Sequence, residues 1–394
     1  MKKILFVQTT FEPPGGGSTV AVWMIEALKR DNSVSILTWT PPDLKGINRF
    51  YGTSLSSSEL IVHSINSILR CIINLIPDPG GFQKTSYLMR VCKRIRKDYD
   101  IIVTADNEID FGCRGIQYFH YPYMHEKMQP NVDVPWHKKL VGIFNGSYRL
   151  WMLVSGFSYR QMINNLTLVN SDWTGSKAKE FYGMETITVY PPAQGDFLDI
   201  AWREKEEGFV CMGRFHPVKR FEEIIHILTR VKTKFPEIHL HIIGTRDKNP
   251  EAHDYYEQLK SLVQVNNSWV SLYENLPREE LLELVSKHRY GIHAHQKEHF
   301  GIAVAEMIKA GSIPFVPNDG GQLEIVGGDE RLIYGSDEEA VTKISRVMSN
   351  TEEQSSLRKY LNSRKEPFST EKFMSQIRKI VRQFQETALR GSPY

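Results

Sequence analysis

Short apolar runs alternate along this chain with longer segments in which apolar residues recur with the period of a helix. The short runs are typical of buried strands and the longer segments of amphipathic helices. In the first half the pattern predicts strands at residues 4–8, 34–38, 101–104, 115–119, 166–169 and 187–190, and helices at 20–29 and from 171 onward. In the second half it predicts strands at 209–212, 240–243, 269–273, 290–294 and 313–316, and helices at 221–235, 252–265, 278–288 and 303–310.

A polar stretch at residues 193–207 divides these two series, directly after Pro191 and Pro192, which end regular structure. Strict alternation of strand and helix predicts parallel sheets with right-handed crossovers. Since 394 residues are also too many for one ordinary core, we expect an α/β protein with two Rossmann-like, doubly wound domains. We place them at 1–195 and 205–369, facing each other across a cleft, with ligands beyond the carboxyl ends of the strands.

Composition narrows the class of function. Hydrophobic content of 41% and charged content of 24% are those of a soluble globular protein, and a net charge of +3 gives no reason to expect nucleic acid. The four cysteines are widely spaced without a CxxC pair, which fits a reducing, cytoplasmic compartment better than a disulfide framework or a zinc site. We expect neither a signal peptide, because the first apolar run is short, nor a membrane-spanning segment, because no apolar stretch reaches about 18 residues.

Gly213, Arg214 and Lys219 form the first candidate binding motif, between a predicted strand and a predicted helix. Gly213 lets the chain turn sharply at the end of the strand, and the two basic side chains can then converge on one anionic group. A diphosphate suits this arrangement. An isolated motif of this kind is more often a solvated basic turn, but its position at the carboxyl end of a strand favours binding.

Glu298 and Glu306 enclose the second motif, and Phe300 and Gly301 lie at the first turn of the helix between them. Unpaired backbone N–H groups and the positive end of the helix dipole are found at such a turn. Two acids beside it suit a ligand that carries both hydroxyls and phosphates, such as a nucleotide-sugar. The alternative is a pair of solvated acids on a surface helix.

Together these motifs resemble glycosyltransferase family four, the retaining glycosyl transferases group one, which have the GT-B fold. The resemblance covers essentially the whole chain and is densest over residues 208–325. The first half agrees through a glycine-rich loop after the first strand, a histidine at a strand end and the segment 169–174. The second half carries the matching residues Gly213, Arg214, Lys219, Glu298, Glu306, Asn318, Asp319, Gly320, Gly321 and Glu324.

The resemblance implies a role for each residue of the second domain. Arg214 and Lys219 would hold the donor diphosphate and stabilise the charge on the leaving group. Glu306 would accept hydrogen bonds from the ribose hydroxyls, and Glu298 would contact the donor sugar near the reaction centre. The remaining phosphate contacts would come from backbone N–H groups, at Phe300, Gly301 and Ile302.

In the first domain the resemblance implies that His120 lines the reaction centre and hydrogen-bonds the donor sugar. Pro122 ends its strand, so that the imidazole can project into a cleft, although a histidine among aromatic residues is more often a packed core residue. Gly15, Gly16 and Gly17 would bring the backbone close to the sugar or the diphosphate, and Gly320 and Gly321 can do the same around the sugar hydroxyls. The alternative for the first three glycines is a flexible surface turn.

The segment His120-Tyr121-Pro122 is also similar to mannosyltransferases of the asparagine-linked-glycosylation type, which extend a lipid-linked oligosaccharide with GDP-mannose. Those sequences usually continue with Thr, where this chain has Tyr123. We therefore expect a retaining hexosyltransferase that moves a sugar, with mannose favoured, from a GDP- or UDP-linked donor to a hydroxyl of a lipid-linked or polysaccharide glycan. The family also implies that the first domain binds the acceptor and that a last helix at 370–390 packs back on it.

We expect no cofactor and no metal in the reaction, because Arg214 and Lys219 supply positive charge and no DxD motif lies beside the donor motif. His293 and His295 share one face of a predicted strand near Glu298 and could contact donor or acceptor. Two alternatives share the fold: a catalytically silent nucleotide-sugar-binding protein, and an epimerase or a phosphorylase-like enzyme. Release of free nucleotide with transfer of the sugar would exclude both.

Two basic and aromatic segments, at residues 84–97 and 136–159, bear on the location of the protein. Basic amphipathic helices with Trp and Tyr can lie in a membrane interface and attract anionic lipids. Helices that pack against the core fit the same pattern equally well. We expect a cytoplasmic protein, with peripheral contact at the inner membrane surface where the acceptor is lipid-linked.

Overall fold

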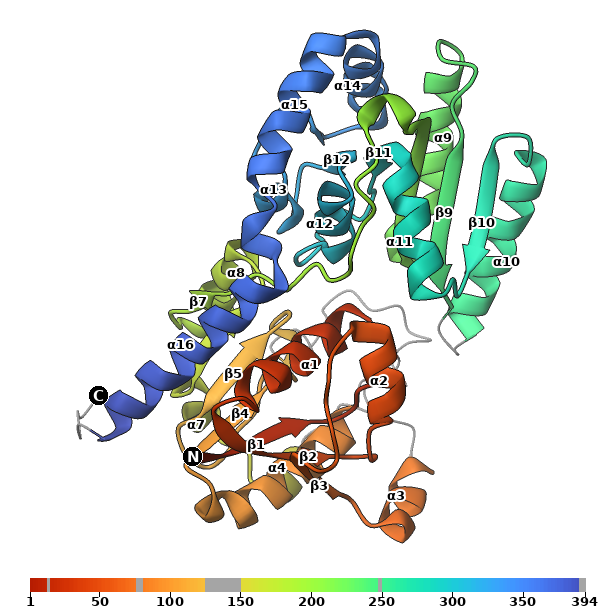
Figure 1. Ribbon diagram of the computed structural model, residues 1–394. Coiled ribbons are helices and arrows are strands. Elements are labelled where there is room, and N and C mark those ends of the chain that lie inside the picture. The colour runs from red at the N-terminus through yellow and green to blue at the C-terminus, as the bar shows by residue number, and fades with distance from the viewer. Residues whose placement is uncertain (13–14, 76–80, 125–149, 247–249, 390–394) are drawn as a thin grey trace. The chain divides into compact units, whose positions relative to one another are not determined.

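The computed structural model describes residues 1–12, 15–75, 81–124, 150–246 and 250–389. It divides the chain into two compact units, of which the first comprises Met1–Pro192 and Thr370–Tyr394 and the second Ala193–Ser369. The second unit begins at Ala193, the first residue of the polar stretch at 193–207, and the backbone N–H of Ala193 donates to the carbonyl oxygen of Phe368 at 2.9 Å. Each unit is built on one parallel sheet with helices on both faces, which confirms the predicted α/β fold class (Figure 1).

The first unit contains a seven-stranded sheet with the order β3-β2-β1-β4-β5-β6-β7. Its strands are β1 Lys2–Gln8, β2 Asn32–Thr38, β3 Leu60–Ser64, β4 Ile101–Thr104, β5 Ile116–Phe119, β6 Leu166–Val169 and β7 Ile187–Thr188. Its helices include α1 Gly16–Leu28, α2 Leu44–Tyr51, α3 Ser67–Asn74, α4 Phe82–Ile95, α7 Tyr159–Ile163, α8 Asp172–Tyr182 and α16 Thr370–Leu389. The strand order reverses between β1 and β4, so the carboxyl ends of these two strands border the crevice where such sheets bind ligands.

Successive side chains of β1 pack on opposite faces of this sheet, as expected for a strand that is buried on both sides. Ile4 and Phe6 belong to a core that includes buried residues of α1, α2 and α16. Leu5 and Val7 belong to a second core, which α3 and α4 complete. Helix α16, drawn in blue, packs against α1 although the two are far apart in sequence (Figure 1).

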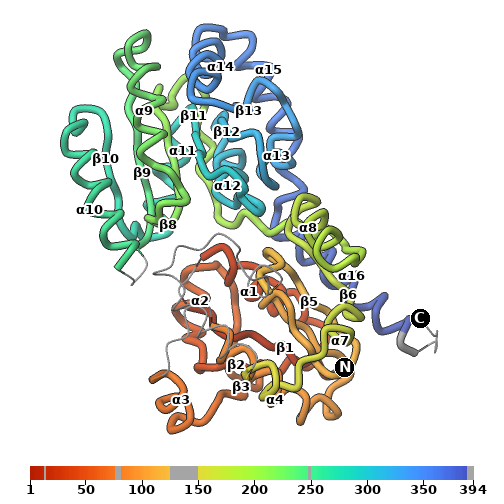
Figure 2. The backbone as a smooth tube through the Cα atoms, turned by 180° about the vertical axis from the view of Figure 1, so that it is seen from behind, coloured from red at the N-terminus to blue at the C-terminus, as the bar shows by residue number. Residues whose placement is uncertain are grey.

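The second unit contains a six-stranded sheet with the order β10-β9-β8-β11-β12-β13 (Figure 2). Its strands are β8 Glu206–Arg214, β9 Leu240–Thr245, β10 Val270–Glu274, β11 His288–Ile292, β12 Ile313–Pro317 and β13 Ile333–Tyr334. Its helices include α9 Phe221–Lys232, α10 Pro250–Val265, α11 Arg278–Lys287, α12 Ile302–Lys309, α13 Gln322–Ile325, α14 Asp337–Ser349 and α15 Thr351–Ser363. Here the order reverses between β8 and β11, which puts the expected binding crevice at their carboxyl ends.

The predicted helix at 20–29 begins earlier than its apolar pattern indicates. Helix α1 begins at Gly16, and the backbone N–H of Thr19 donates to the carbonyl oxygen of Gly15 at 2.9 Å. Gly16 and Gly17 therefore form the first helical turn instead of a loop before the helix. Glycine has the lowest helix propensity after proline, so a pattern read from apolar residues places the start too late.

The segment 84–97 corresponds to α4 and the 3-10 turn Arg96–Asp98 that follows it. Its apolar side chains Leu88, Met89 and Cys92 are buried in the core of the first unit, which supports core packing over a membrane interface for this segment. Residues 136–149 of the other basic and aromatic segment lie outside the described residues. Among the helices that the structure describes, none is long and apolar enough to span a bilayer.

Candidate functional site

The carboxyl ends of β8 and β11 bring the predicted donor motifs together in the second unit. Gly213 and Arg214 are the last residues of β8, and His293 directly follows β11. Between β8 and α9 the chain forms a short 3-10 turn, Pro217–Lys219, in which the ring of His216 accepts a hydrogen bond from the N–H of Val218. The stem of Lys219 folds back over Gly213, where a Cβ would lie 3.3 Å from its Cδ. The absence of a side chain at Gly213 thus lets the lysine lie close to the end of the strand.

The carboxylate of Glu298 is the centre of this cluster. Its Oε2 atom forms an ion pair with the ammonium of Lys219, and both side chains are only 15% exposed. The same oxygen lies 3.1 Å from Nε2 of His293 and 2.9 Å from Nδ1 of His295. The structure therefore brings one predicted cation and one predicted acid into direct contact, and it adds two histidines whose proximity to Glu298 the sequence indicated.

The charges in this cluster are set by their neighbours. Burial opposes ionisation of Glu298, but the Lys219 ammonium and the hydrogen bonds from His293 and His295 hold its pKa well below the usual range. Burial also lowers the pKa of His293, so its ring is neutral near pH 7. Glu298 is thus an ionised hydrogen-bond acceptor and not a proton donor. The two histidines and Glu298 could also hold a metal ion, although the Lys219 ammonium occupies the same carboxylate.

A glycine loop holds the backbone of Glu298. The N–H of Gly321 donates to the carbonyl oxygen of Glu298 at 2.8 Å, and Gln322 Nε2 donates to that of His295 at 3.0 Å. Gly320 has a φ of +89°, and a Cβ there would overlap the backbone of Glu298. The predicted role of Gly320 and Gly321 was approach to a sugar. In the structure their direct contact is with the segment that carries Glu298.

Glu306 lies on α12 and is 7% exposed. Its Oε1 accepts a hydrogen bond of 2.6 Å from the guanidinium of Arg278, which also donates to the carbonyl oxygen of Gln194 at 2.5 Å. Arg278 is the first residue of α11, and no motif in the sequence marked it as a partner of Glu306. Both side chains are at most 15% exposed, so this is a largely buried, charge-assisted pair.

The predicted phosphate contacts lie where α12 begins. Gly301, with a φ of +103°, precedes the first helical residue, Ile302, and Phe300 is 3% exposed. The aromatic ring of Phe300 packs edge-on against that of Phe368, with centroids 5.9 Å apart. Gly301 adopts a left-handed conformation that most other residues avoid, which explains a glycine at this turn. Arg214 is exposed at the end of β8.

In the first unit His120 directly follows β5 and is half-buried. Its Nε2 lies 3.0 Å from the carbonyl oxygen of Ala105 and can only donate to that oxygen, which leaves the Nδ1 atom as an acceptor in the neutral ring. The side chain of Asn107 accepts from the backbone N–H of His120 at 2.6 Å, and the side chain of Asn170 donates to its carbonyl oxygen at 3.0 Å. Burial lowers the pKa of His120 to about 4, so the imidazole is neutral at physiological pH.

Asp106 follows β4, on the other side of the switch point from β1. Its carboxylate accepts hydrogen bonds from the N–H of Thr9 and, at 2.7 Å, from the side chain of Gln8, which ends β1. Burial raises the pKa of Asp106 to about 6. Gly16 and Gly17 are exposed at the first turn of α1. The sequence pattern did not mark Asp106 as a site residue, because its link to β1 depends on the strand order.

Comparisons with known proteins agree with this arrangement. Residues 196–364 match the family model of glycosyl transferases group 1. A relative from Homo sapiens, "GDP-Man:Man(3)GlcNAc(2)-PP-Dol alpha-1,2-mannosyltransferase", is 27% identical over 309 residues, which are 69% of this chain and 62% of the relative. The chain thus spans less than two thirds of the length of that relative.

Two solved structures resemble the whole chain. Sucrose-phosphate synthase from Thermosynechococcus elongatus superposes with a TM-score of 0.72 at 15% identity, over 98% of this chain and 100% of that one. The Anabaena protein HepE, solved in complex with UDP and glucose, superposes with a TM-score of 0.68 at 13% identity, over 97% and 100% of the two chains. The sequence resemblance is therefore confirmed: residues 196–364, nearly the whole second unit, match the glycosyl transferases group 1, and the chain as a whole has the GT-B fold.

Proposed function

We propose that this chain is a retaining glycosyltransferase that moves a sugar from a nucleotide-diphosphate donor to an acceptor hydroxyl. The observation that carries the proposal is the contact of Lys219 with Glu298 at the switch point of the second sheet, within the segment that matches the family. A cation beside an ionised acid suits a ligand with both a diphosphate and sugar hydroxyls. The name of the human relative, which includes GDP-mannose, supports mannose as the sugar and GDP as the carrier over UDP.

The chemistry that we propose follows from where charge develops. The bond between the anomeric carbon and the phosphate oxygen breaks, and that carbon forms a bond to the acceptor oxygen. Negative charge grows on the departing diphosphate, where Lys219 and Arg214 stabilise it. The acceptor proton passes to an oxygen of the departing phosphate on the same face of the sugar, which retains the anomeric configuration. Glu298 stays ionised and accepts hydrogen bonds from the sugar, consistent with its low pKa.

We propose that transfer needs neither a cofactor nor a divalent ion. A cation held by His293, His295 and Glu298 would face the ammonium of Lys219, which already pairs with the same carboxylate oxygen. Two positive charges that contact the same carboxylate oxygen repel each other strongly in a poorly solvated site. Transfer by protein treated with EDTA should therefore match transfer by untreated protein.

The acceptor that we favour is a lipid-linked glycan, bound by the first unit at the cytoplasmic face of a membrane. All four cysteines are free in the structure, which fits a reducing compartment. Helix α3 supports contact with a lipid surface, because Ile68, Ile72 and, directly after the helix, Leu75 are 70%, 56% and 84% exposed. Its other side packs into the core through Ile73. An apolar stripe of this kind can enter a membrane interface.

A donor panel tests the proposed function. Calorimetry with GDP-mannose, UDP-glucose and the free nucleotides identifies the donor, and release of nucleotide with transfer to a lipid-linked oligosaccharide measures the reaction. Lys219→Ala should lower transfer by about 100-fold or more, since it removes a cation that stabilises the leaving group. Lys359→Ala, at an exposed lysine of α15, is the matched control and should leave transfer unchanged.

The outcomes separate the proposal from its alternatives. Donor binding without transfer to any acceptor would support the catalytically silent binding protein of the same fold. Transfer by Lys219→Ala at the wild-type rate would overturn the assignment of the site. Inverted anomeric configuration in the product, detected by NMR, would overturn the proposed course of the reaction.

A further inference from the structure

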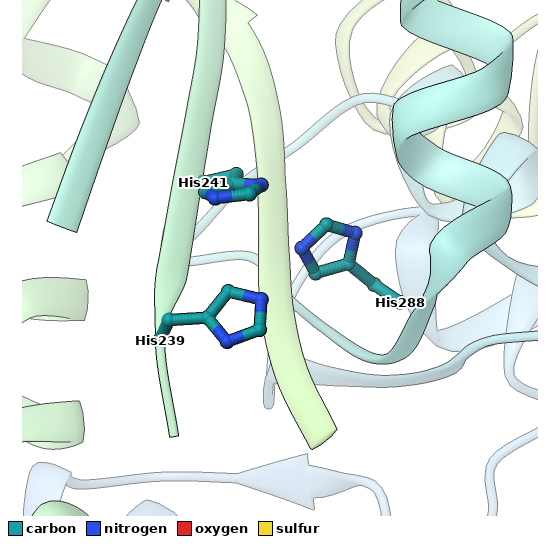
Figure 3. A group of neighbouring side chains, drawn as sticks. All are labelled: His239, His241 and His288. Atoms are coloured by element: carbon teal, nitrogen blue, oxygen red, sulfur yellow. The ribbon is translucent and has the colours of Figure 1, made fainter. Parts of the chain in front are cut away.

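Three histidines lie together at the edge of the second sheet opposite the candidate site (Figure 3). His239 directly precedes β9, His241 is the second residue of that strand, and His288 is the first residue of β11. The amino ends of parallel strands all lie at one end of the sheet and the carboxyl ends at the other. The length of the strands therefore separates this cluster from Glu298 and Lys219, which lie at the carboxyl ends. None of the three belongs to the site described above.

The backbone of the intervening strand makes room for these rings. Gly208 of β8 lies between β9 and β11, and a Cβ at this position would overlap the imidazole of His239. The ladder also shifts register here: His288 pairs with Glu206 and Tyr290 with Phe209, so β8 advances three residues while β11 advances two. Such irregularities re-aim side chains. Rings from both neighbouring strands thus meet above a position without a side chain.

Two ring nitrogens of this cluster lack a hydrogen-bond partner. Nδ1 of His241 and Nε2 of His288 are buried and make no hydrogen bond, whereas Nε2 of His239 lies 3.0 Å from the carboxylate oxygen Oε2 of Glu206. The residue His288 is fully buried, and its Nδ1 lies 2.7 Å from the carbonyl oxygen of Leu284, to which it donates. That bond fixes the tautomer and leaves Nε2 with a lone pair. A ligating histidine commonly donates its other N–H to a backbone carbonyl in this way.

We propose that His239, His241 and His288 bind one Zn²⁺ ion and that the carboxylate of Glu206 completes a tetrahedral site. One nitrogen from each ring lies within 4.8 Å of the others, and Glu206 Oε2 lies 3.0 Å from His239 Nε2. Tetrahedral zinc would draw these nitrogens to about 3.4 Å from one another, given Zn–N distances of about 2.1 Å. His239 and His241 are only half-buried, so their rings can make this adjustment.

The chemistry of the donor set favours zinc. Imidazole nitrogens and one carboxylate suit Zn²⁺ better than Mg²⁺ or Ca²⁺, which prefer oxygen ligands. With four protein ligands the site has no open position, which makes it structural. It would join the amino ends of β9, β8 and β11.

Metal analysis of the full chain tests this site. The protein is stripped with EDTA, loaded with Zn²⁺ and passed through a desalting column, and zinc is measured by mass spectrometry. We expect one zinc per chain and a rise in melting temperature of roughly 5–10 °C at free Zn²⁺ about 100-fold above its Kd. Loading with Co²⁺ should give the visible absorption bands of tetrahedral cobalt. Wild-type protein that retains no zinc would overturn the proposal.

Variants locate the ion. His288→Ala and, at a half-buried position less costly to folding, His239→Asn should each lose the bound zinc and the thermal shift, and His226→Asn on the exposed face of α9 is the matched control. Melting in EDTA shows whether each variant folds like the metal-free wild type. Zinc that persists in His239→Asn but is lost in His295→Asn would assign the ion to the cluster around Glu298 and overturn the proposal.

Discussion

Arg278 holds Glu306 in the second unit, and the pair joins the start of α11 to α12. Removal of one partner from a largely buried ion pair leaves the other charge uncompensated, which typically costs about 3–5 kcal/mol. Glu306 also stands where the family resemblance places the ribose contact. Loss of stability and loss of donor binding are thus two separable consequences of a change at this position.

We expect Glu306→Ala to weaken donor binding by about 10–100-fold, equivalent to roughly 1.4–2.8 kcal/mol, and to lower the melting temperature. Isothermal calorimetry with the donor and thermal unfolding measure the two effects. Arg278→Ala is the matched control, since it breaks the same pair but keeps the carboxylate. Equal losses of donor affinity in both variants would mean that Glu306 acts only by holding the fold.

At the scale of elements, the loop before α13 shows how one glycine supports a site residue. Gly320 and Gly328 both have positive φ angles, of +89° and +68°. Only Gly320 faces the backbone of Glu298, whereas a Cβ at Gly328 would have nothing within 4 Å. An alanine at either position causes the backbone strain of a left-handed residue, but only an alanine at Gly320 would also displace the segment that carries Glu298. A comparison of the two substitutions therefore separates these effects.

Gly320→Ala should destabilise the second unit by about 1–3 kcal/mol more than Gly328→Ala, because it adds an overlap to a similar strain. It should also weaken donor binding, while Gly328→Ala should not. Urea unfolding followed by fluorescence, together with donor calorimetry, provides both measurements. Equal effects of the two substitutions would contradict the support of Glu298 by this loop.

The apolar stripe on α3 leads to a prediction about membrane binding. The double variant Ile68→Glu, Ile72→Glu should reduce flotation of the protein with anionic vesicles at least tenfold. Each change replaces an exposed apolar side chain with a carboxylate, which the anionic lipid headgroups repel. Val265→Glu, at an 84% exposed valine at the end of α10, is the control for added charge. Unchanged flotation of the double variant would remove α3 from the proposed membrane contact.

Periodicity predicts elements well where each contributes many buried residues. Strand β1 and helix α9 were predictable because nearly every apolar residue in them faces the core. Helix α2, whose buried residues are Ile47 and Tyr51, and the two-residue strand β13 carry too little pattern to be recognised. Their existence depends on the neighbouring strands and helices, which the local sequence does not contain.

The candidate site shows the same division. The types and spacing of Lys219, Glu298 and Glu306 were enough to name them. The partner of Glu306 was not predictable, because its pairing with Arg278 joins residues on two helices. The same holds outside this site for the contact of His239 with His288, which joins two strands that are not neighbours. Such contacts depend on strand order and register, so they become visible only in the folded chain.

At the scale of the whole molecule, histidines whose pKa values are lowered by the fold set the response of stability to acid. The pKa values of His120, His241 and His288 are lowered to about 4, 4 and 3, below the value of about 6.5 in an unfolded chain. The unfolded chain then binds more protons as pH falls, so stability is complete above pH 6.5 and is lost toward pH 4. Asp106, with a pKa raised to about 6, acts in the opposite direction but is a single group.

We therefore expect the melting temperature, measured in EDTA, to fall as pH decreases from 6.5 to 4.5. His120→Gln should flatten part of this dependence, because glutamine keeps a donor for the carbonyl oxygen of Ala105 without titrating. Scanning calorimetry at half-unit pH steps measures the slope. A melting temperature that rises over this interval would show that these histidines are protonated in the folded protein.

Helix α16 has a consequence for how the protein is made. It completes the core of the first unit through Phe373, Ile377 and Val381, yet it follows the entire second unit in the chain. During synthesis on the ribosome the second unit can fold as soon as it emerges, whereas the unit translated first must wait for the segment that closes it. Nascent chains stalled before Thr370 should thus expose the apolar side of α1 and attract chaperones.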